Sequence, residues 1–250
     1  MIPDPVKEFI RLNTDADERP SSFSMFGRQW DLLSDVFAPV YDISTMLFTA
    51  WLPLSEGNDL LEVGCGAGVT AVMAATRGCH SVIALDINPA AVENTRRNAR
   101  RHGVGDRVHV TQSDLFSAVT PTDRYDIIYW NSSFVEAPAD TRALTPVEMA
   151  VLDPGYRTHK RFLAEAPQYL KPNGRIFLGF SSLGNSARLQ EMAAVHEIEV
   201  RALRSSSSAL SAGTTYQLLE LVPAERPTAV QSEESHGTTR GSNGDEAQHQ

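Results

Sequence analysis

The chain has 250 residues, of which 42% are hydrophobic and 21% charged, the composition of an ordinary globular protein with a full core. No apolar run approaches the ~20 residues that would cross a bilayer, which argues against a membrane protein. The formal net charge of −9 disfavours a nucleic-acid partner, because proteins that bind phosphate backbones usually carry a basic surface.

The two cysteines, Cys65 and Cys79, indicate neither a disulfide framework nor a metal site. The first residues also lack the basic and then apolar pattern of a secretory signal. We therefore expect a reduced, cytoplasmic protein without a bound metal. It is expected to be a monomer or a homodimer.

The first part of the chain, residues 1–50, is expected to form a helical extension or lid. A short helix is predicted near 5–12 and a second one at 43–51, for which Asp42 is well placed as N-cap. The segment 23–33 is dense in large apolar groups. It either packs against the edge of the sheet or forms a lid over a ligand, and both interpretations stay open.

Strand and helix patterns alternate regularly from residue 59, which is typical of a parallel α/β sheet. Strands are expected near 59–63, 81–86, 107–111, 125–130, 175–180, 197–205 and 213–221. Helices are expected near 68–77, 89–102, 156–170 and 186–195. This domain spans 51–222. The tail, 223–250, lacks aromatic residues and should be disordered, because it cannot bury enough apolar surface to offset its chain entropy.

A glycine-rich turn follows the first of these strands, in the sequence Asp-Leu-Leu-Glu-Val-Gly-Cys-Gly-Ala-Gly at residues 59–68. Its three glycines, Gly64, Gly66 and Gly68, let the backbone turn sharply and let a ligand approach the main chain. Asp86 ends the next strand, where a carboxylate can accept both hydroxyls of a ribose. The pattern predicts a nucleoside-bearing cofactor.

Two further carboxylates narrow the choice of cofactor. Glu62 stands two residues before the first glycine, where it would repel a pyrophosphate but suit a cation such as an α-ammonium group. Asp114 follows the third strand and could accept a hydrogen bond from an adenine amine.

Together these residues resemble the S-adenosylmethionine (SAM) site of class I methyltransferases, over roughly residues 35–221. The resemblance implies that Glu62 and the glycine turn hold the methionine end, Asp86 the ribose, and Asp114 with Leu115 the adenine. It also implies an α/β, Rossmann-like fold. In that fold a seven-stranded sheet in the order 3-2-1-4-5-7-6 is flanked by helices and ends in an antiparallel pair.

The fourth strand runs into Asn131-Ser132-Ser133-Phe134, at the edge where open α/β sheets bind their ligands. This stretch resembles the Asn-Pro-Pro-Tyr motif of small-domain methyltransferases that act on planar or amide nitrogens. In that family the Asn carbonyl accepts N–H groups of the target and the aromatic ring stacks on it. Two serines in place of the prolines predict a softer, more polar slot. Alternatively, Asn131 only satisfies backbone groups of the loop.

The predicted site residues fall into three groups. Those expected to bind SAM are Glu62, Gly64, Gly66, Gly68, Asp86, Ile87, Asp114, Leu115 and Asn131. The catalytic candidates are Asn131 and Tyr156. The substrate contacts are Ser132, Phe134 and Tyr156. Glu136 and His159 could accept a proton, but solvated positions are favoured for both.

The leading hypothesis is a SAM-dependent N-methyltransferase acting on an amine or amide of a small metabolite or peptide, with O-methylation left open. A second hypothesis keeps the cofactor but closes SAM into a small ring, with release of methylthioadenosine. A third is a non-catalytic SAM-binding subunit. The nucleoside product discriminates between the three.

Overall fold

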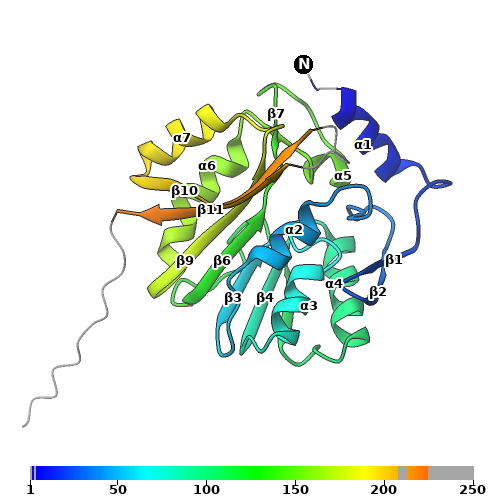
Figure 1. Ribbon diagram of the computed structural model, residues 1–250, viewed down its shortest axis with the longest axis horizontal. Helices are drawn as coiled ribbons and strands as arrows, with labels where there is room; N and C mark the ends of the chain where they lie inside the picture. Colours follow the sequence, from blue (N-terminus) through cyan, green and yellow to red (C-terminus); the bar gives the residue numbers. More distant parts are fainter. Residues whose placement is uncertain (1, 3, 208–212, 225–250) are drawn as a thin grey trace, which may run out of the picture.

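The computed structural model describes residues 2, 4–207 and 213–224 of the protein (Figure 1). Among them, seven strands form the central sheet, in the order β10-β11-β9-β6-β3-β4-β5. The strands are β3 (Asp59–Val63), β4 (Ser81–Asp86), β5 (Val108–Gln112), β6 (Tyr125–Asn131), β9 (Leu170–Ser181), β10 (Ile198–Ser207) and β11 (Thr215–Pro223). Counted along the chain within this sheet, the order reads 6-7-5-4-1-2-3, so the predicted topology is confirmed.

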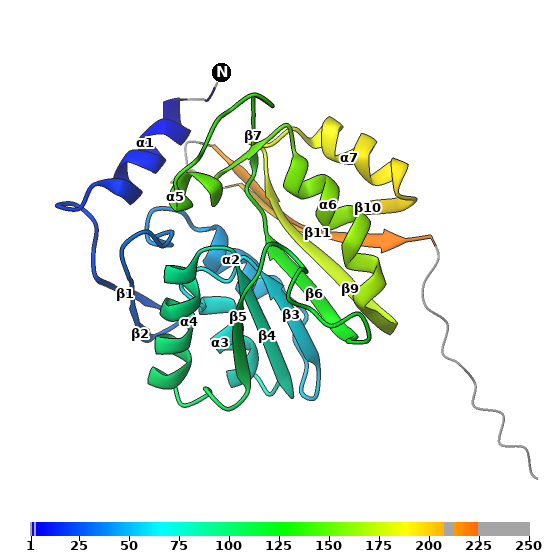
Figure 2. The same ribbon diagram turned by 180° about the vertical axis from the view of Figure 1, so that it is seen from behind.

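Helices cover both faces of this sheet. They are α2 (Ser44–Trp51), α3 (Val69–Thr76), α4 (Pro89–Arg101), α6 (Arg157–Glu165) and α7 (Ser186–Val195). Leu60 and Leu61 of β3 are both fully buried, and successive side chains of a strand point to opposite faces. Leu60 packs in a cluster with α2, α3 and α4, whereas Leu61 packs with α6 and α7. The fold is therefore a three-layer α/β/α sandwich (Figures 1 and 2).

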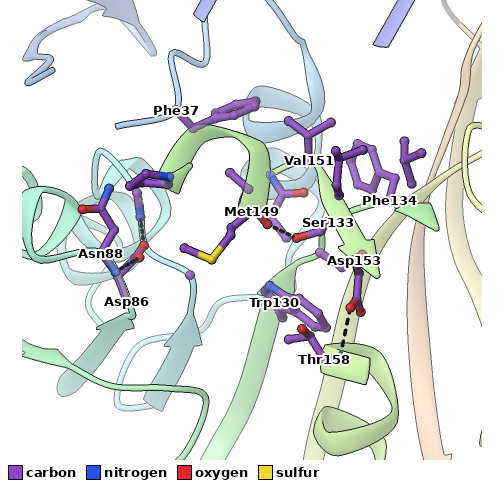
Figure 3. A pocket seen from close by; sticks show the side chains of 18 of the residues that line it. Phe37, Asp86, Asn88, Trp130, Ser133, Phe134, Met149, Val151, Asp153 and Thr158 are labelled. Carbon is purple, nitrogen blue, oxygen red and sulfur yellow. Dashed lines mark hydrogen bonds between the residues drawn. The ribbon is translucent and has the colours of Figure 1, made fainter. Parts of the chain in front are cut away.

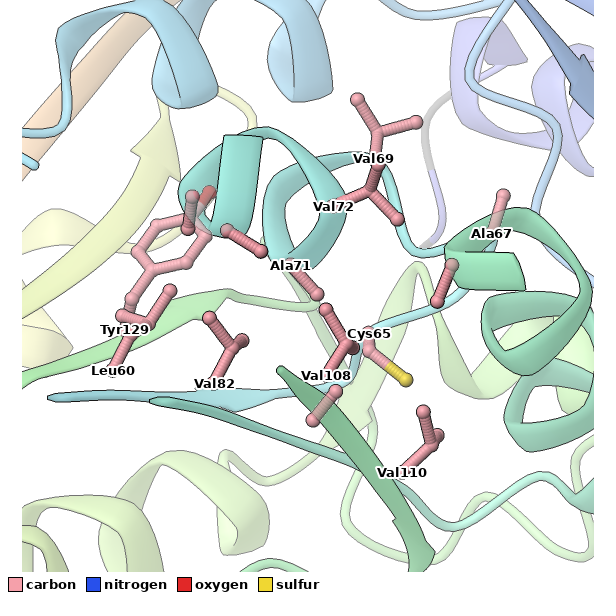
Figure 4. Packing of buried hydrophobic residues seen from close by; sticks show 14 of the residues in the cluster. Leu60, Cys65, Ala67, Val69, Ala71, Val72, Val82, Val108, Val110 and Tyr129 are labelled. Atoms are coloured by element: carbon pink, nitrogen blue, oxygen red, sulfur yellow. The ribbon is translucent and has the colours of Figure 1, made fainter. Parts of the chain in front are cut away.

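The cluster under α3 supports the strand that leads into the glycine turn. Leu60, Val82 and Val108 come from three adjacent strands and pack with the apolar residues of α3 (Figure 4). None of the three is more than 4% exposed. Burying a Val or Leu side chain contributes roughly 1.5–3 kcal/mol, so this contact holds α3 firmly against the sheet.

The direction of the strands determines where polar residues gather. β3 runs parallel to β4 and to β6, and β6 runs parallel to β9. Since parallel strands end at the same edge of a sheet, Val63, Asp86 and Asn131 reach one edge together. The last two strands, β10 and β11, are antiparallel, as expected.

A hairpin that the sequence patterns did not predict precedes this core, formed by β1 (Ser22–Met25) and β2 (Arg28–Asp31). Its Trp30 is fully buried. Two buried asparagines of α4 hold the segment: Asn98 Oδ1 accepts from the backbone N–H of Asp31 at 2.8 Å, and Asn94 Oδ1 accepts from that of Leu33 at 2.7 Å. The hairpin therefore packs on α4, rather than directly on the edge of the sheet as the packing interpretation of this segment expected.

A second unpredicted feature connects β6 to α6. It consists of β7 (Val135–Ala137), α5 (Pro146–Met149) and β8 (Leu152–Pro154), with β7 and β8 paired in parallel. Thr145 and Glu148 form a capping box at the start of α5. The predicted N-terminal helix is present as α1 (Asp4–Thr14) and contacts α5. The sequence did not predict β7 and β8 because strands of three residues are too short to show a recognisable alternation of apolar and polar side chains.

Several element boundaries differ from expectation, among them the start of β9, which begins at Leu170 instead of near 175. Helix α2 begins at Ser44, and Asp42 Oδ1 accepts from the backbone N–H of Ser44 at 2.7 Å, so Asp42 caps the first turn from one position further out. The predicted helix 156–170 is shorter, because α6 ends at Glu165 and a 3₁₀ turn, η1 (Ala166–Tyr169), follows. Pro167 cannot donate the backbone hydrogen bond that would continue the helix.

No helix in the described part of the chain is long and apolar enough to cross a bilayer. The prediction of disorder for the tail concerns residues 225–250 above all, and these lie outside the described residues.

Replacing Asn98 by alanine should reduce the free energy of unfolding by about 3 kcal/mol. The side chain accepts from Asp31 N–H and donates to the carbonyls of Asp31 and Ala67 at 3.0 and 2.8 Å, and each buried group left unpaired costs ~1–3 kcal/mol. Urea denaturation measures the change. Arg97→Ala is the control, since Arg97 lies on the same helix with an exposed ion pair to Glu93 and should cost under ~1 kcal/mol. Equal losses would contradict the role of Asn98.

Candidate functional site

A cavity of about 680 Å³ lies at the carboxyl ends of β3, β4 and β6, within the range of small-molecule sites. Most of the predicted site residues border it: Glu62, Gly64, Gly66, Asp86, Ile87, Asp114, Leu115, Asn131, Ser132 and Phe134. Gly68 and Tyr156 are not among its lining residues. None of the residues of the β1–β2 hairpin borders the cavity either, which disfavours the lid interpretation of that segment.

The glycine turn has the backbone conformation that its residues predict. Gly64, Gly66 and Gly68 have φ angles of 69°, 54° and 81°, in the left-handed region that favours glycine. At Gly68 a Cβ would also lie 2.9 Å from the Cα of Thr95. Gly68 therefore does not contact the cavity; it allows α3 and α4 to approach closely where the turn ends.

Asp86 is held between the turn and the start of α4. Its Oδ2 accepts from the backbone N–H of Gly66 at 2.9 Å, and its Oδ1 accepts from that of Asn88 at 2.9 Å (Figure 3). Burial raises its pKa, although these hydrogen bonds oppose the shift. Each oxygen keeps a lone pair for a further donor, as a vicinal diol would supply.

Glu62 is the most unusual group in the cavity wall. It is 3% exposed, and its Oε2 has no hydrogen-bond partner among the described residues. Burial raises its pKa to about 8; Thr70 and the backbone of Ala71 oppose this shift, while the charge of Asp86 adds to it. A buried carboxylate with a free oxygen favours a cationic ligand.

At the next strand end, Asp114 borders the cavity but is 53% exposed and paired with Arg161. Both of its oxygens accept from Arg161 Nη1, at 2.8 and 2.9 Å. Leu115 beside it has a positive φ of 49° and is buried. Ile87 is 46% exposed, although it is a large apolar residue that borders the cavity.

Asn131 ends β6 at the centre of this edge. Its Nδ2 donates to Ser44 Oγ over a long 3.4 Å, while its Oδ1 is buried and lacks a partner in the described part of the chain. An unpaired buried carbonyl costs ~1–3 kcal/mol, so a donor from a ligand would be favourable. This environment argues against a side chain that only satisfies the backbone of its loop.

The hydroxyls of the two serines after Asn131 are engaged in hydrogen bonds, which argues against the softer, more polar slot that the loss of the prolines predicts. Ser132 Oγ donates to the carbonyl of Gly179 at 2.8 Å, and Ser133 Oγ donates to that of Met149 at 2.7 Å. These hydrogen bonds tie the loop to β9 and to the end of α5. They restrain it by contacts rather than by the fixed φ angle of a proline.

Tyr156 requires a correction, because we expected it to line the crevice. It is fully buried, and its hydroxyl donates to the carbonyl of Phe134 at 2.6 Å and accepts from the N–H of Asn185 at 2.8 Å. Burial raises its pKa to about 12. Its hydroxyl is thus engaged in fixing the backbone of Phe134 and does not reach the cavity.

His159 is not solvated, contrary to the favoured interpretation. It is 1% exposed and its Nδ1 lies 2.8 Å from Asp153 Oδ2. Burial pushes the pKa of Asp153 upward, but its hydrogen bonds and the charge interaction with His159 outweigh burial and lower it. Glu136, the other residue for which a solvated position was favoured, is half-buried and accepts a hydrogen bond from Asn185 Nδ2 at 2.8 Å.

Several lining residues were missed in the sequence. Asn88 caps α4 by accepting from the N–H of Ala90 at 2.9 Å and borders the cavity beside Asp86; Asn-Pro at a helix start is a signal that could have revealed it. Val6, Phe9 and Met149 also border the cavity. Their positions depend on the packing of α1 and α5, for which the sequence carries no local signal.

Known proteins resemble this chain in sequence and in fold. The family model described as methyltransferase small domain matches residues 32–201. A candidate protein N5-glutamine methyltransferase of Methanocaldococcus jannaschii is 30% identical over 160 residues, which cover 63% of this chain and 78% of the relative. The tRNA1(Val) adenine-N6 methyltransferase of Yersinia enterocolitica is 32% identical over 97 residues, 38% of each chain.

Among solved structures, the 16S rRNA N2 methyltransferase of T. thermophilus, in complex with AdoMet and guanosine, has a TM-score of 0.59 at 20% identity. The match covers 82% of this chain and 50% of that one. The chain also spans only 24% of the ribosomal protein L11 methyltransferase of Exiguobacterium sp. that it matches. Because the family model covers more than half of the chain, the protein belongs to the methyltransferase small-domain family and is a SAM-dependent class I methyltransferase.

Proposed function

We propose that the protein transfers the methyl group of SAM to a planar amide or amine nitrogen held between Asn131 and Phe134. The observation that carries the proposal is Asn131 itself, which borders the cavity and whose buried Oδ1 lacks a partner among the described residues. An acceptor oxygen is the group that an N–H of the substrate requires.

The cavity wall fits the cofactor. Glu62 offers an unpartnered carboxylate oxygen to an α-ammonium group, and Asp86 has lone pairs left for the two ribose hydroxyls. Ile87 and Leu115 provide apolar contacts for a base, next to Asp114. When bound, SAM supplies an electrophilic methyl group on a sulfonium centre.

The remaining demand on the protein is positioning, because methyl transfer needs the nitrogen lone pair aligned with the breaking bond. Asn131 would accept an N–H and thereby orient that lone pair. The ring of Phe134 would limit the tilt of the substrate plane; it is itself restrained by edge contacts with Phe48 and Tyr216, with ring centroids 6.3 and 6.4 Å away. Tyr156 fixes the carbonyl of Phe134 at 2.6 Å.

The relatives support nitrogen as the acceptor atom. One is named for a glutamine amide and another for the exocyclic nitrogen of adenine, and both nitrogens are planar and carry N–H groups. They differ in the carrier of that nitrogen, a protein in one case and a tRNA in the other. We propose an amide or amine carried by a peptide or small molecule, since the chain has a net charge of −9.

Identification of the nucleoside product tests this proposal. The protein is incubated with SAM and amide or amine acceptors, and the products are separated by chromatography. S-adenosylhomocysteine together with an N-methylated acceptor is expected. Methylthioadenosine would indicate ring closure of SAM instead, and the absence of both would favour a binding subunit.

Asp86→Ala should weaken SAM binding roughly tenfold or more, since a hydrogen bond to a charged group contributes ~1.5–3 kcal/mol. Calorimetry measures the affinity, and a melting curve shows whether the variant remains folded. Asp86→Asn is the matched control, because it keeps the shape and one acceptor and should lose less affinity. Unchanged affinity in a folded Asp86→Ala protein would refute the ribose assignment.

The raised pKa of Glu62, about 8, predicts a pH-dependent affinity for SAM. In the free protein the carboxyl is mostly protonated at neutral pH, whereas an ammonium ligand favours its ionised form. Binding should therefore release a proton, and the association constant should rise with pH up to about 8, by at most about tenfold per pH unit.

Calorimetry at neutral pH in two buffers with different ionisation heats measures this release. Glu62→Gln cannot release the proton, so its binding heat should not depend on the buffer. Equal proton release from Glu62→Gln and the parent protein would show that another group is responsible.

Asn131→Ala should leave the affinity for SAM nearly unchanged while kcat falls about a hundredfold, because a misplacement by ~1 Å can cost that much. Asn131→Asp preserves the shape but adds a negative charge near the sulfonium, which should keep or strengthen SAM binding while turnover still falls. Rates of S-adenosylhomocysteine formation give kcat. Parental turnover in both variants would reduce Asn131 to a loop residue.

A further inference from the structure

The cavity has two ends of different chemistry. One end contains the polar groups at the strand ends, among them Glu62 and Asp86. The other end is bordered by apolar side chains from separate segments, Val6, Phe9, Phe37, Leu144, Met149 and Val151. In Figure 3, Asp86 and Asn88 lie on one side, Phe134 and Val151 lie across from them, Phe37 lies above, and Met149 extends between the two sides.

The apolar end offers contact surface but few free hydrogen-bonding groups. Of its charged residues, Glu8, Arg142 and Arg157 are exposed, and Glu8 is paired with Arg11 at 2.8 Å. Asp153 is buried, but both of its oxygens already accept hydrogen bonds, from the N–H groups of Thr158 and His159, and its Oδ2 also lies 2.8 Å from His159 Nδ1. The hydroxyls of the two serines after Asn131 donate to backbone carbonyls. What the buried part of this wall can recognise is therefore an apolar group.

Helix α1 forms one side of this end and is firmly attached. Val6 is 2% exposed, and the rings of Phe9 and Phe37 lie 5.3 Å apart. Asn13, 1% exposed, accepts from the N–H of Ala38 at 2.7 Å and donates to the carbonyl of Phe9 at 3.0 Å. The family match begins at residue 32, so α1 (Asp4–Thr14) lies outside the part of the chain that the family model matches.

From this arrangement we propose that the methyl acceptor is a small molecule whose nitrogen is attached to an apolar body, aromatic or branched aliphatic, that fills the part of the cavity bordered by α1 and α5. The inference rests on the proposed N-methylation. A new N–C bond forms as the S–C bond of SAM breaks, S-adenosylhomocysteine leaves, and the nitrogen loses its proton to solvent.

A glutamine side chain on a protein would use this end poorly. Its stem has two methylene groups, which cannot cover aromatic and aliphatic side chains from three segments. Apolar surface that stays wet contributes nothing to binding, whereas surface removed from water contributes ~25 cal/mol per Å². An apolar body attached to the same nitrogen would remove this apolar surface of the cavity from water.

Calorimetry on the full chain saturated with S-adenosylhomocysteine tests the proposal with three probes: 3-phenylpropanamide, propanamide and a pentapeptide with a central glutamine. The first probe should bind at least about tenfold more tightly than the other two, as expected for burial of a phenyl group. Phe9→Ala and Met149→Ala, from opposite walls, should each reduce this preference to under about threefold. Neither should change the affinity for S-adenosylhomocysteine.

Lys7→Ala is the matched control, since Lys7 lies on α1 but is exposed and outside the cavity wall; it should keep the full preference. Equal binding of the three probes, a preference for the peptide, or an undiminished preference in both wall variants would overturn the inference. If the preference is found but SAM gives no methylated amide, the apolar acceptor site stands and amide N-methylation fails. If only the peptide is methylated, amide N-methylation stands and the apolar acceptor site fails.

Discussion

The site depends on one backbone constraint, the three left-handed glycines between β3 and α3. They let the chain reverse within a few residues, so that the N–H of Gly66 faces Asp86 of the neighbouring strand at 2.9 Å. The same turn brings α3 against α4, where Thr95 leaves no room for a side chain at position 68. A buried carboxylate, Glu62, is thereby enclosed next to the turn, and its pKa rises because water is excluded.

The parts of this architecture that depend on local sequence could be predicted. Apolar runs such as the one through Leu60 and Leu61 indicate strands buried on both faces, and polar residues at their ends gather at one edge. The strand order came from a family resemblance. Features that depend on distant partners could not be predicted. The hydroxyl of Tyr156 bonds to residues 22 and 29 positions away, and no pattern near His159 indicates its burial against Asp153.

The altered loop after β6 illustrates how different residues can meet one requirement. A loop that orients a nitrogen must be stiff, and prolines achieve stiffness by fixing φ in every state of the chain. Ser132 and Ser133 achieve it only in the folded protein, through the carbonyls of Gly179 and Met149. The sequence shows the loss of the prolines but not the compensating contacts, which is why a softer slot was expected.

The two ends of the cavity are supported by different parts of the fold. Polar groups for the cofactor stand on strand ends, which the core of the sheet holds rigidly through residues such as Leu60. The apolar end is bordered by α1, α5 and the segment after α5, and its Val6 and Val151 belong to a third hydrophobic cluster, separate from the two that pack on the sheet. Substitutions in that cluster can reshape the acceptor end without disturbing the sheet. Specificity for the acceptor can therefore diverge while the cofactor end of the fold stays the same.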